Sequence, residues 1–347
     1  MIENVFLIIG LLLFACQACD NKSSLSFTEP SFVHSRNLKG KVLMDSFVMG
    51  MCTDLDYHNG ILFVVGYTGA EEEKLHLFSA ENGQYIKSLY PSGRGPGEAV
   101  SMLGVDVDSQ TGKVCFYDAI TGRLHSFQLD SVIRHSNLTN DLFSCPYPYM
   151  VQILNKSGSY IGVGGLRKSD GQTPRVVLFN NDSIVNEYYD YPAVQMPMRD
   201  GIKIGYQFAH YEMSPKGDKM VCASIYGAIL EFFSLERNRI ELDRVVGFIK
   251  PIYTIDKNGF FKLLPEQTVF GFLDLCVTDN YIYTIYCGDT NTELNNQVAV
   301  FDWKGRGVCL YKTDYHLECI CVNDEEDKMY ATAIDEDSEK IIVEFKL

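Results

Sequence analysis

Short runs of alternating apolar and polar residues follow one another from about residue 30 to the end of the chain. They are rich in β-branched and aromatic residues, and clusters of Gly, Asn, Asp and Pro separate them. No stretch in this region has the periodicity of an amphipathic helix. The pattern therefore predicts an all-β protein.

The strands repeat as a unit of four antiparallel strands. In the first unit, residues 51–90, an Asn59-Gly60 turn joins the first two strands and an Asn82-Gly83 turn joins the last two. The same order of strands and turns returns at residues 103–130, 150–190, 209–247, 273–313 and 318–347. Unit starts lie about 45 to 65 residues apart, as in propeller blades with loop insertions. The sequence predicts a six-bladed β-propeller of four-stranded antiparallel blades, spanning residues 31–347.

The last unit stops after its third strand. Residues 32–47 form a strand-like segment that is left over before the first unit. A ring of blades closes best when one blade contains both ends of the chain. We therefore expect this N-terminal segment to complete the last blade.

The first nineteen residues differ from the rest. Residues 5–16 carry no charge, and this run is shorter than the roughly 20 residues that a membrane-spanning helix needs. We interpret residues 1–19 as a signal peptide with a lipobox, in which Cys16 receives the lipid and Cys19 is the alternative. Residues 20–30 are polar and form a tether.

The six units, the GRGPGE segment at residues 93–98, the FDWKG turn at residues 301–305 and the lipobox together resemble the TolB-like six-bladed propeller lipoproteins of Gram-negative anaerobes. The resemblance covers residues 30–347. It implies secretion across the inner membrane and a lipid anchor in the periplasm or at the cell surface. It implies no established chemistry.

Charge and cysteine content narrow the choice of partners. The net charge is −15, and the chain has no basic cluster, which argues against nucleic acid and against binding to an anionic membrane surface other than by the lipid anchor. Nine cysteines follow the signal segment, mostly inside apolar strand-like runs. We expect most of them to be free buried thiols.

The glycine-rich segment at residues 90–100 resembles a phosphate-binding loop only superficially. A phosphate loop opens a helix, whereas the residues that follow here predict a strand. We expect this segment to carry the chain from blade one to blade two. Its only charged residues, Arg94 and Glu98, either brace the crossover or form part of a ligand-binding rim.

Several acidic residues fall on the predicted inner strands, which line the axial channel of a propeller. Asp54, Asp106 and Glu212 share one register, and His210 and Asp274 stand two residues earlier in it. Carboxylates around a channel would suit Ca²⁺, as in propeller lactonases, where the metal polarises a carbonyl. The alternative is that they bond to backbone groups or to structural water.

Catalytic signatures are otherwise absent from the sequence, which has no GxSxG elbow, no HExxH motif and no pair of histidines at metal-ligand spacing. We therefore favour a binding or scaffold module of the cell envelope, without a cofactor, over an enzyme. The alternative is a divalent-metal-dependent hydrolase or lyase.

Tyrosines are frequent around the third unit and the segment after it. Tyr191, Tyr206 and Tyr211 are candidates for a rim that binds a peptide, a glycan or an envelope protein, because tyrosine combines a flat face with a hydroxyl group. Tyrosine is also ordinary strand material, so a structural role is the alternative.

Overall fold

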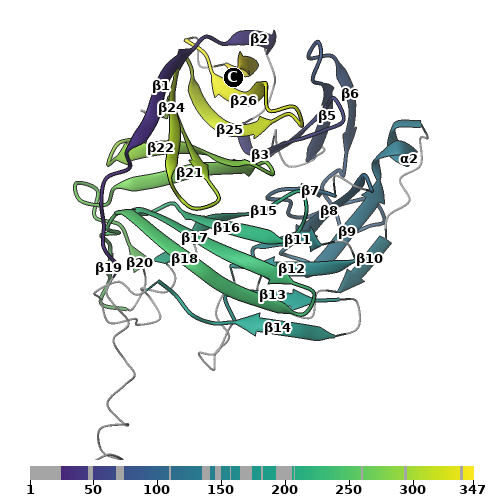
Figure 1. Cartoon of the computed structure of the whole chain (residues 1–347). Helices are drawn as coiled ribbons and strands as arrows, with labels where there is room; N and C mark the ends of the chain where they lie inside the picture. Colours follow the sequence, from purple (N-terminus) through teal and green to yellow (C-terminus); the bar gives the residue numbers. More distant parts are fainter. Residues whose placement is uncertain are drawn as a thin grey trace, which may run out of the picture.

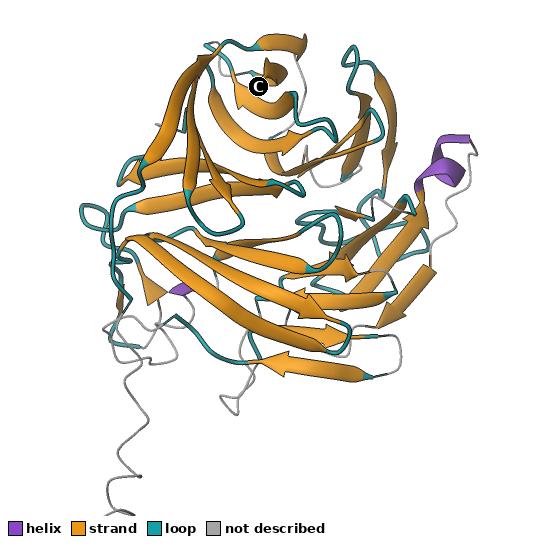
Figure 2. Ribbon diagram, viewed as in Figure 1, coloured by secondary structure: helices purple, strands orange, loops and turns teal. Residues whose placement is uncertain are grey.

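The computed structural model describes residues 25–45, 50–67, 74–108, 111–134, 141–144, 150–156, 158–164, 174–180, 183–192, 205–206, 208–258, 261–292, 295–336 and 339–347. The predicted signal segment, with Cys16 and Cys19, lies outside these residues. Figures 1 and 2 show six sheets arranged around a common centre, with the short helix α2 (Leu129–Arg134) at the periphery. The prediction of an all-β, six-bladed propeller is confirmed.

Each blade is a sheet whose neighbouring strands, in chain order, run antiparallel. Blade one contains β3 (Met51–His58), β4 (Ile61–Tyr67), β5 (Leu75–Ser79) and β6 (Tyr85–Leu89). Blade two contains β7 (Asp106–Val107), β8 (Lys113–Asp118), β9 (Arg123–Gln128) and β10 (Asp141–Ser144). Blade three contains β11 (Gln152–Lys156), β12 (Ser159–Val163), β13 (Val176–Phe179) and β14 (Ile184–Tyr188).

The second half of the ring follows the same plan. Blade four contains β15 (Ala209–Met213), β16 (Lys219–Ser224), β17 (Ala228–Glu236) and β18 (Arg239–Ile249). Blade five contains β21 (Phe270–Val277), β22 (Tyr281–Asp289), β23 (Gln297–Asp302) and β24 (Gly307–Thr313), and blade six contains β25 (His316–Val322), β26 (Lys328–Ile334) and β27 (Lys340–Lys346). A small sheet of β19 (Thr254–Ile255) and β20 (Phe261–Lys262) lies between blades four and five in the sequence.

The turn between β3 and β4 shows how local sequence sets the strand register. His58 pairs with Ile61, so only Asn59 and Gly60 form the turn. Both have positive φ, 48° and 79°, as a two-residue hairpin turn of the primed type requires. Asn and Gly are the residues that adopt this conformation most easily, and they fix the register of the blade.

Alternation along the strands sends side chains to both faces of each sheet. In β8, Cys115 packs in the cluster shared with blade three, and its neighbour Phe116 packs in the cluster shared with blade one. A buried apolar cluster of this kind lies between each pair of neighbouring blades. The described cysteines are free, and all are buried except the half-buried Cys276.

The N-terminal segment closes the ring. Strand β2 (Lys41–Met44) pairs antiparallel with β27 and is the fourth strand of blade six, so the predicted closure is confirmed. The segment forms two strands, however, where the sequence predicted one. Strand β1 (Phe32–Leu38) pairs parallel with β24 and becomes a fifth strand of blade five. Figure 1 shows both strands, in purple, beside the green and yellow strands of these last two blades.

Gly40 explains why the segment divides. A Cβ atom at this position would collide with Val343 and Tyr315. The backbone N–H of Gly40 also donates to Asp314 Oδ1 at 2.9 Å. The chain therefore passes close to blade six at this residue, crossing from the edge of one blade to the edge of the next.

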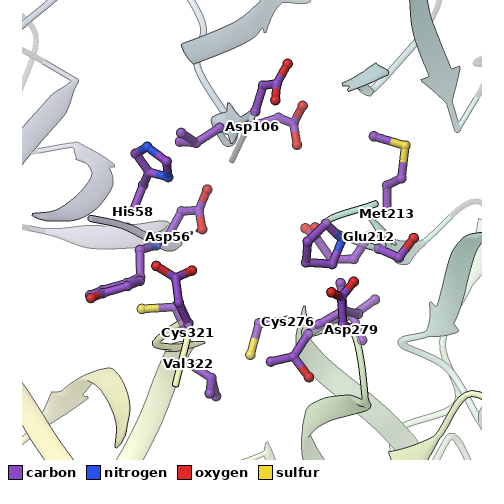
Figure 3. Close-up of a pocket in the computed structure, with 18 of the residues that line it drawn as sticks. Asp56, His58, Asp106, Glu212, Met213, Cys276, Asp279, Cys321 and Val322 are labelled. Atoms are coloured by element: carbon purple, nitrogen blue, oxygen red, sulfur yellow. Dashed lines mark hydrogen bonds between the residues drawn. The ribbon is translucent and has the colours of Figure 1, made fainter. Parts of the chain in front are cut away.

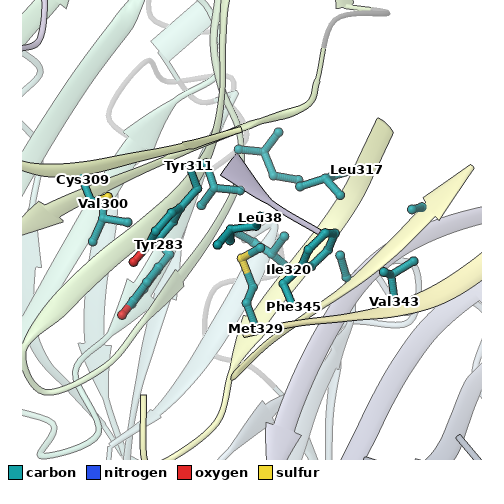
Figure 4. Close-up of a cluster of buried hydrophobic side chains, with 14 of the residues drawn as sticks. Leu38, Tyr283, Val300, Cys309, Tyr311, Leu317, Ile320, Met329, Val343 and Phe345 are labelled. Carbon is teal, nitrogen blue, oxygen red and sulfur yellow. The ribbon is translucent and has the colours of Figure 1, made fainter. Parts of the chain in front are cut away.

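Leu38 joins the N-terminal segment to the core. It is 6% exposed, and it packs in the cluster between blades five and six with residues that include Tyr283, Met329 and Phe345. Figure 4 shows Leu38 among these side chains. By contrast, Val33 on the same strand is 74% exposed. Leu38 is thus the contact by which β1 joins the cluster between blades five and six.

We predict that Leu38→Ala destabilises the ring by about 2–4 kcal/mol, because truncation of a buried leucine removes apolar contact and leaves a cavity. The melting temperature of the purified protein measures the effect. Val33→Ala is the matched control and should leave the melting temperature nearly unchanged. Equal melting temperatures for the two variants would contradict this role of Leu38.

Candidate functional site

The inner strands of the six blades surround an axial channel that widens into a cavity at each end. The cavity where these strands begin, here called the strand-start cavity, has a volume of about 240 Å³ and is lined by residues that include Gly104, Gln152 and His210. The cavity where they end, the strand-end cavity, has a volume of about 350 Å³. Figure 3 shows side chains from several blades, Asp56, Asp106 and Glu212 among them, around the open centre of the strand-end cavity.

The two cavities share part of their walls. Asp54, Val105, Glu212 and Leu275 line both, so they form the partition between them. Two of these four residues are acidic. The wall between the two cavities therefore carries carboxyl groups.

The structure places all five predicted channel residues on the channel wall, but divides them between the cavities. Asp106 lines only the strand-end cavity, while His210 and Asp274 line only the strand-start cavity. Among the described residues, no group of three His, Cys, Asp or Glu side chains is arranged to hold a metal ion. The geometry thus gives no support to the Ca²⁺ site that the sequence raised.

Three of the predicted carboxylates bind the backbone of the next blade. Asp54 Oδ2 accepts a hydrogen bond from the N–H of Val105 at 2.8 Å, and Asp274 Oδ2 accepts one from Ile320 at 2.7 Å. Asp106 Oδ2 accepts one from the N–H of Asn155. Each bond satisfies a backbone donor at the channel wall and ties one blade to its neighbour. These contacts match the structural alternative of the sequence analysis.

Enclosure raises the pKa of these acids. Burial raises the pKa of Asp106 and Asp274 to about 7, although the backbone N–H bonds that they accept oppose the shift. The pKa values of Asp54 and Glu212 rise well above their usual range, first through burial and then through the negative charge of neighbouring carboxylates. The accessible part of these side chains faces the channel, so bulk water solvates their charges poorly. The channel therefore holds protons at neutral pH.

His210 stands beside this group as a neutral imidazole. Burial lowers its pKa to about 4. Its Nδ1 lies 3.9 Å from Asp274 Oδ1, which is too long for a hydrogen bond. Among the described residues, Nε2 has no hydrogen-bond partner.

Asp56 is a channel acid that the sequence analysis missed. It lines the strand-end cavity, and its Oδ1 accepts the N–H of Tyr57 at 2.7 Å. Burial raises its pKa to about 7. Asp56 lies two residues after Asp54 and therefore on the same face of β3, so the strand alternation contained the signal.

The glycine-rich crossover serves the fold. Glu98 Oε2 accepts the N–H of Gly95 at 2.7 Å, and a Cβ atom at Gly93 would collide with the same carboxylate. The loop thus folds around Glu98, which braces it, and Arg94 is exposed. Neither charged residue lines a channel cavity, so neither forms part of the predicted rim there.

Of the predicted tyrosine rim, Tyr206 and Tyr211 are buried, at 3% and 2% exposed, and Tyr211 also lines the strand-start cavity. The Tyr211 hydroxyl accepts a hydrogen bond from Arg175 Nε at 3.2 Å. Arg175 is itself buried and forms two hydrogen bonds with the carboxylate of Glu231, one of them at 2.7 Å. A buried guanidinium is stabilised by hydrogen-bond acceptors and aromatic faces around it, and Tyr211 is buried because it supplies one of these acceptors.

Tyr191 belongs to the same interior group. Its ring lies 5.0 Å from the Arg175 guanidinium carbon, and it packs against Tyr206 with ring centroids 6.3 Å apart. It is half-buried. Tyr211 thus packs in the cluster between blades three and four, whereas Tyr191 and Tyr206 pack in a separate cluster beside blade four with Tyr253.

The fold and the channel define a six-bladed propeller with an acid-lined axis. A family model described as TolB-like 6-blade propeller-like matches residues 31–325, and the chain belongs to this family. No curated protein matches the sequence. Among the described residues, no helix has the length and the apolar composition that crossing a bilayer demands.

Several solved structures share the fold. A protein of Bacteroides fragilis that is named as a candidate exported protein has a TM-score of 0.61 and 12% identity, over 94% of this chain and 99% of that one. A member of the DUF4221 family from Bacteroides vulgatus has a TM-score of 0.56 and 13% identity, over 92% and 99%. Regucalcin from Agrobacterium tumefaciens, described as a calcium-binding protein, has a TM-score of 0.50 and 12% identity, over 90% and 95%. At these identities the likeness concerns the fold.

We predict that Asp106→Asn stabilises the protein near pH 8. The folded-state pKa of Asp106, about 7, lies above its ordinary value of 3.8, so the folded protein retains a proton that the unfolded chain has lost. The contribution of Asp106 to stability therefore falls as pH rises from about 4 to 7. Asparagine keeps an acceptor for Asn155 without the charge, and the melting temperature should rise by about 2–6 °C near pH 8 and little near pH 5.

Thermal melts across this pH range check the prediction. Asp130→Asn is the control, because Asp130 is exposed and forms a surface ion pair with Arg134. It should leave the pH dependence of the wild type unchanged. A loss of stability in Asp106→Asn that is equal at both pH values would contradict the electrostatic account.

Proposed function

We propose that this chain is an exported lipoprotein of the cell envelope that acts as a binding or scaffold module, with its ligand site in the strand-start cavity. The observation that carries the site is the composition of this cavity. Leu103 and Phe208 lie at its wall and are 42% and 43% exposed. Such apolar side chains next to a polar floor are typical of a small-ligand site.

The polar floor supports a ligand with hydrogen-bonding groups. It contains the neutral imidazole of His210 and the carboxyl groups of Asp54, Glu212 and Asp274. Since burial raises the pKa of these acids, they are available as hydroxyl donors as well as acceptors. A glycan hydroxyl or a peptide amide suits this floor, and the Phe208 ring suits the apolar face of either ligand. An envelope protein would reach the cavity with a loop of the same chemistry.

Two observations support the proposed envelope location. The uncharged run at residues 5–16 ends at Cys16 in a pattern that we interpret as a lipobox, and a solved structure of the same fold is named as a candidate exported protein. In this proposal a signal peptidase cuts before Cys16, or before Cys19, and the lipid on the new terminus holds the propeller at the membrane.

We predict that Phe208→Ala weakens binding of a glycan or peptide ligand by about tenfold or more, because truncation removes the aromatic contact at the cavity wall. Glycan arrays and a peptide library supply the probes, and titration of each hit measures the affinity. Ile133→Ala is the matched control, since Ile133 is 42% exposed on helix α2 and lies outside this cavity. Hits that bind wild type and Phe208→Ala equally would place the ligand site elsewhere.

We predict that Cys16→Ser abolishes incorporation of a labelled fatty acid when the full chain is expressed in a Gram-negative host. The thioether to lipid requires a sulfur atom, and serine supplies none. Cys19→Ser serves as the control and should retain the label. Labelling that persists in Cys16→Ser and disappears in Cys19→Ser would move the anchor to Cys19, and labelling of the double variant would overturn the lipobox interpretation.

A further inference from the structure

Two cysteines face each other across the seam between blades six and one, where the ring closes. Cys52 lies near the start of β3 in blade one, and Cys319 lies on β25 in blade six. The two strands lie side by side. Both side chains are buried in the apolar cluster of this seam, with residues that include Leu55 and Tyr330. Both thiols are free in the structure.

A β-bulge turns Cys52 toward the seam. The register of β3 shifts between Cys52 and Asp54, so that Thr53 is an extra residue between them. With regular alternation Cys52 would share a face with Asp54, whose carboxylate binds blade two. The bulge places it instead on the same face as Leu55, toward blade six.

Strand β25 has a matching irregularity, with a register shift between Leu317 and Cys319. Leu317 and Ile320 pack toward blade five, whereas Cys319 and Cys321 pack toward blade one. Bulges change the direction of a side chain at a defined position in a strand. The two bulges therefore direct Cys52 and Cys319 into the same seam.

The two thiols are in direct contact. The side chain of Cys319 forms a hydrogen bond with that of Cys52. The Cys52 Sγ donates in turn to the carbonyl oxygen of Asp54 at 3.4 Å. From such a contact, side-chain rotation and a small approach of the strands bring two sulfur atoms to the S–S bond length of about 2 Å.

We propose that Cys52 and Cys319 form a disulfide that locks the ring when the protein meets a disulfide oxidant. The oxidant is a small disulfide such as oxidised glutathione, or the active-site disulfide of a thiol oxidoreductase. Two protein thiols and one oxidant disulfide give one protein disulfide and two oxidant thiols, so that electrons and protons balance. The exported location proposed above is an environment that supplies such an oxidant.

Cys52 should react first. It is 9% exposed, against 4% for Cys319, and it follows Met51, which is 55% exposed. The hydrogen bond with Cys52 and burial both raise the pKa of the Cys319 thiol, so Cys319 keeps its proton at neutral pH. Cys52, as a thiolate, attacks the oxidant disulfide, forms a mixed disulfide and releases one oxidant thiol. Cys319 then loses its proton to water, attacks the Cys52 sulfur and releases the second.

The disulfide would make closure of the ring covalent on both sides of the seam. Hydrogen bonds hold β2 on β27, so release of this strand opens the seam. A bond between residues 52 and 319 keeps β3 against β25 even then. Because it spans most of the chain, it also restricts the unfolded state strongly. We expect the oxidised protein to melt about 3–8 °C above the reduced protein.

The test compares the purified protein in buffers of reduced and of oxidised glutathione. One sample is oxidised in the folded state. A second is refolded from urea in the oxidising buffer, so that access to buried thiols does not limit the reaction. Peptide mass spectrometry after alkylation identifies the linked cysteines. Oxidation should link Cys52 to Cys319 and raise the melting temperature, and dithiothreitol should reverse both changes.

Three variants separate this bond from other thiol chemistry. Cys52→Ser and Cys319→Ser should each melt at the same temperature in both buffers, because neither can form the bond. Cys309→Ser is the matched control, since Cys309 is 6% exposed on β24 of blade five, and it should retain the shift. Each variant is compared with itself in two buffers, so a loss of stability from the substitution alone does not affect the result.

Free thiols at Cys52 and Cys319 in both the folded and the refolded samples would overturn the proposal. So would a disulfide that joins either residue to another cysteine, such as Cys321, or an oxidised protein that melts no higher than the reduced one. None of these results depends on the strand-start cavity or on the lipid anchor, so a failure of the proposed function would be seen separately.

Discussion

The structure depends on closure of the ring between its last blade and its first. Strand β2 belongs to blade six by hydrogen bonding, and the same segment of chain leads into β3, the inner strand of blade one. A covalent link thus joins the two blades. The apolar cluster at this seam adds side-chain contact, and the Tyr57 and Tyr330 rings stack across it with centroids 5.8 Å apart. Without this seam the sheets would form an open arc with two exposed ends.

Closure also determines the chemistry of the channel. When six sheets face one axis, their inner strands converge, and side chains from positions far apart in the sequence share a small volume. Asp54 and Asp106 secure their neighbours through backbone N–H groups, and these contacts bring their carboxylates toward the same axis. The bonds that hold the blades together therefore concentrate negative charge. The raised pKa values express the electrostatic cost of that arrangement.

Sequence reasoning succeeded where the determinants are local. The Asn59-Gly60 turn sets its own hairpin, and the leftover strand before blade one indicated closure. It failed where a distant residue decides the outcome. In the sequence alone, nothing near Tyr211 indicates that it is buried. Its hydroxyl binds Arg175, which pairs with Glu231, 56 residues away in the chain. The distribution of the candidate acids between the two cavities likewise depends on how the blades pack. The sequence of a single strand does not determine that packing.

The acids of the partition couple the two cavities thermodynamically. Asp54 and Glu212 line both, and the negative charge of Asp54 and Asp106 is among the causes that raise the pKa of Glu212. A cation in the strand-end cavity favours ionisation of Glu212, and a ligand that accepts a hydrogen bond from the protonated carboxyl of Glu212 in the strand-start cavity favours its protonation. Because the same proton enters both equilibria, an occupant of one cavity changes the affinity of the other, and by linkage the effect is reciprocal. The partition therefore separates the two cavities and also couples the binding of their occupants.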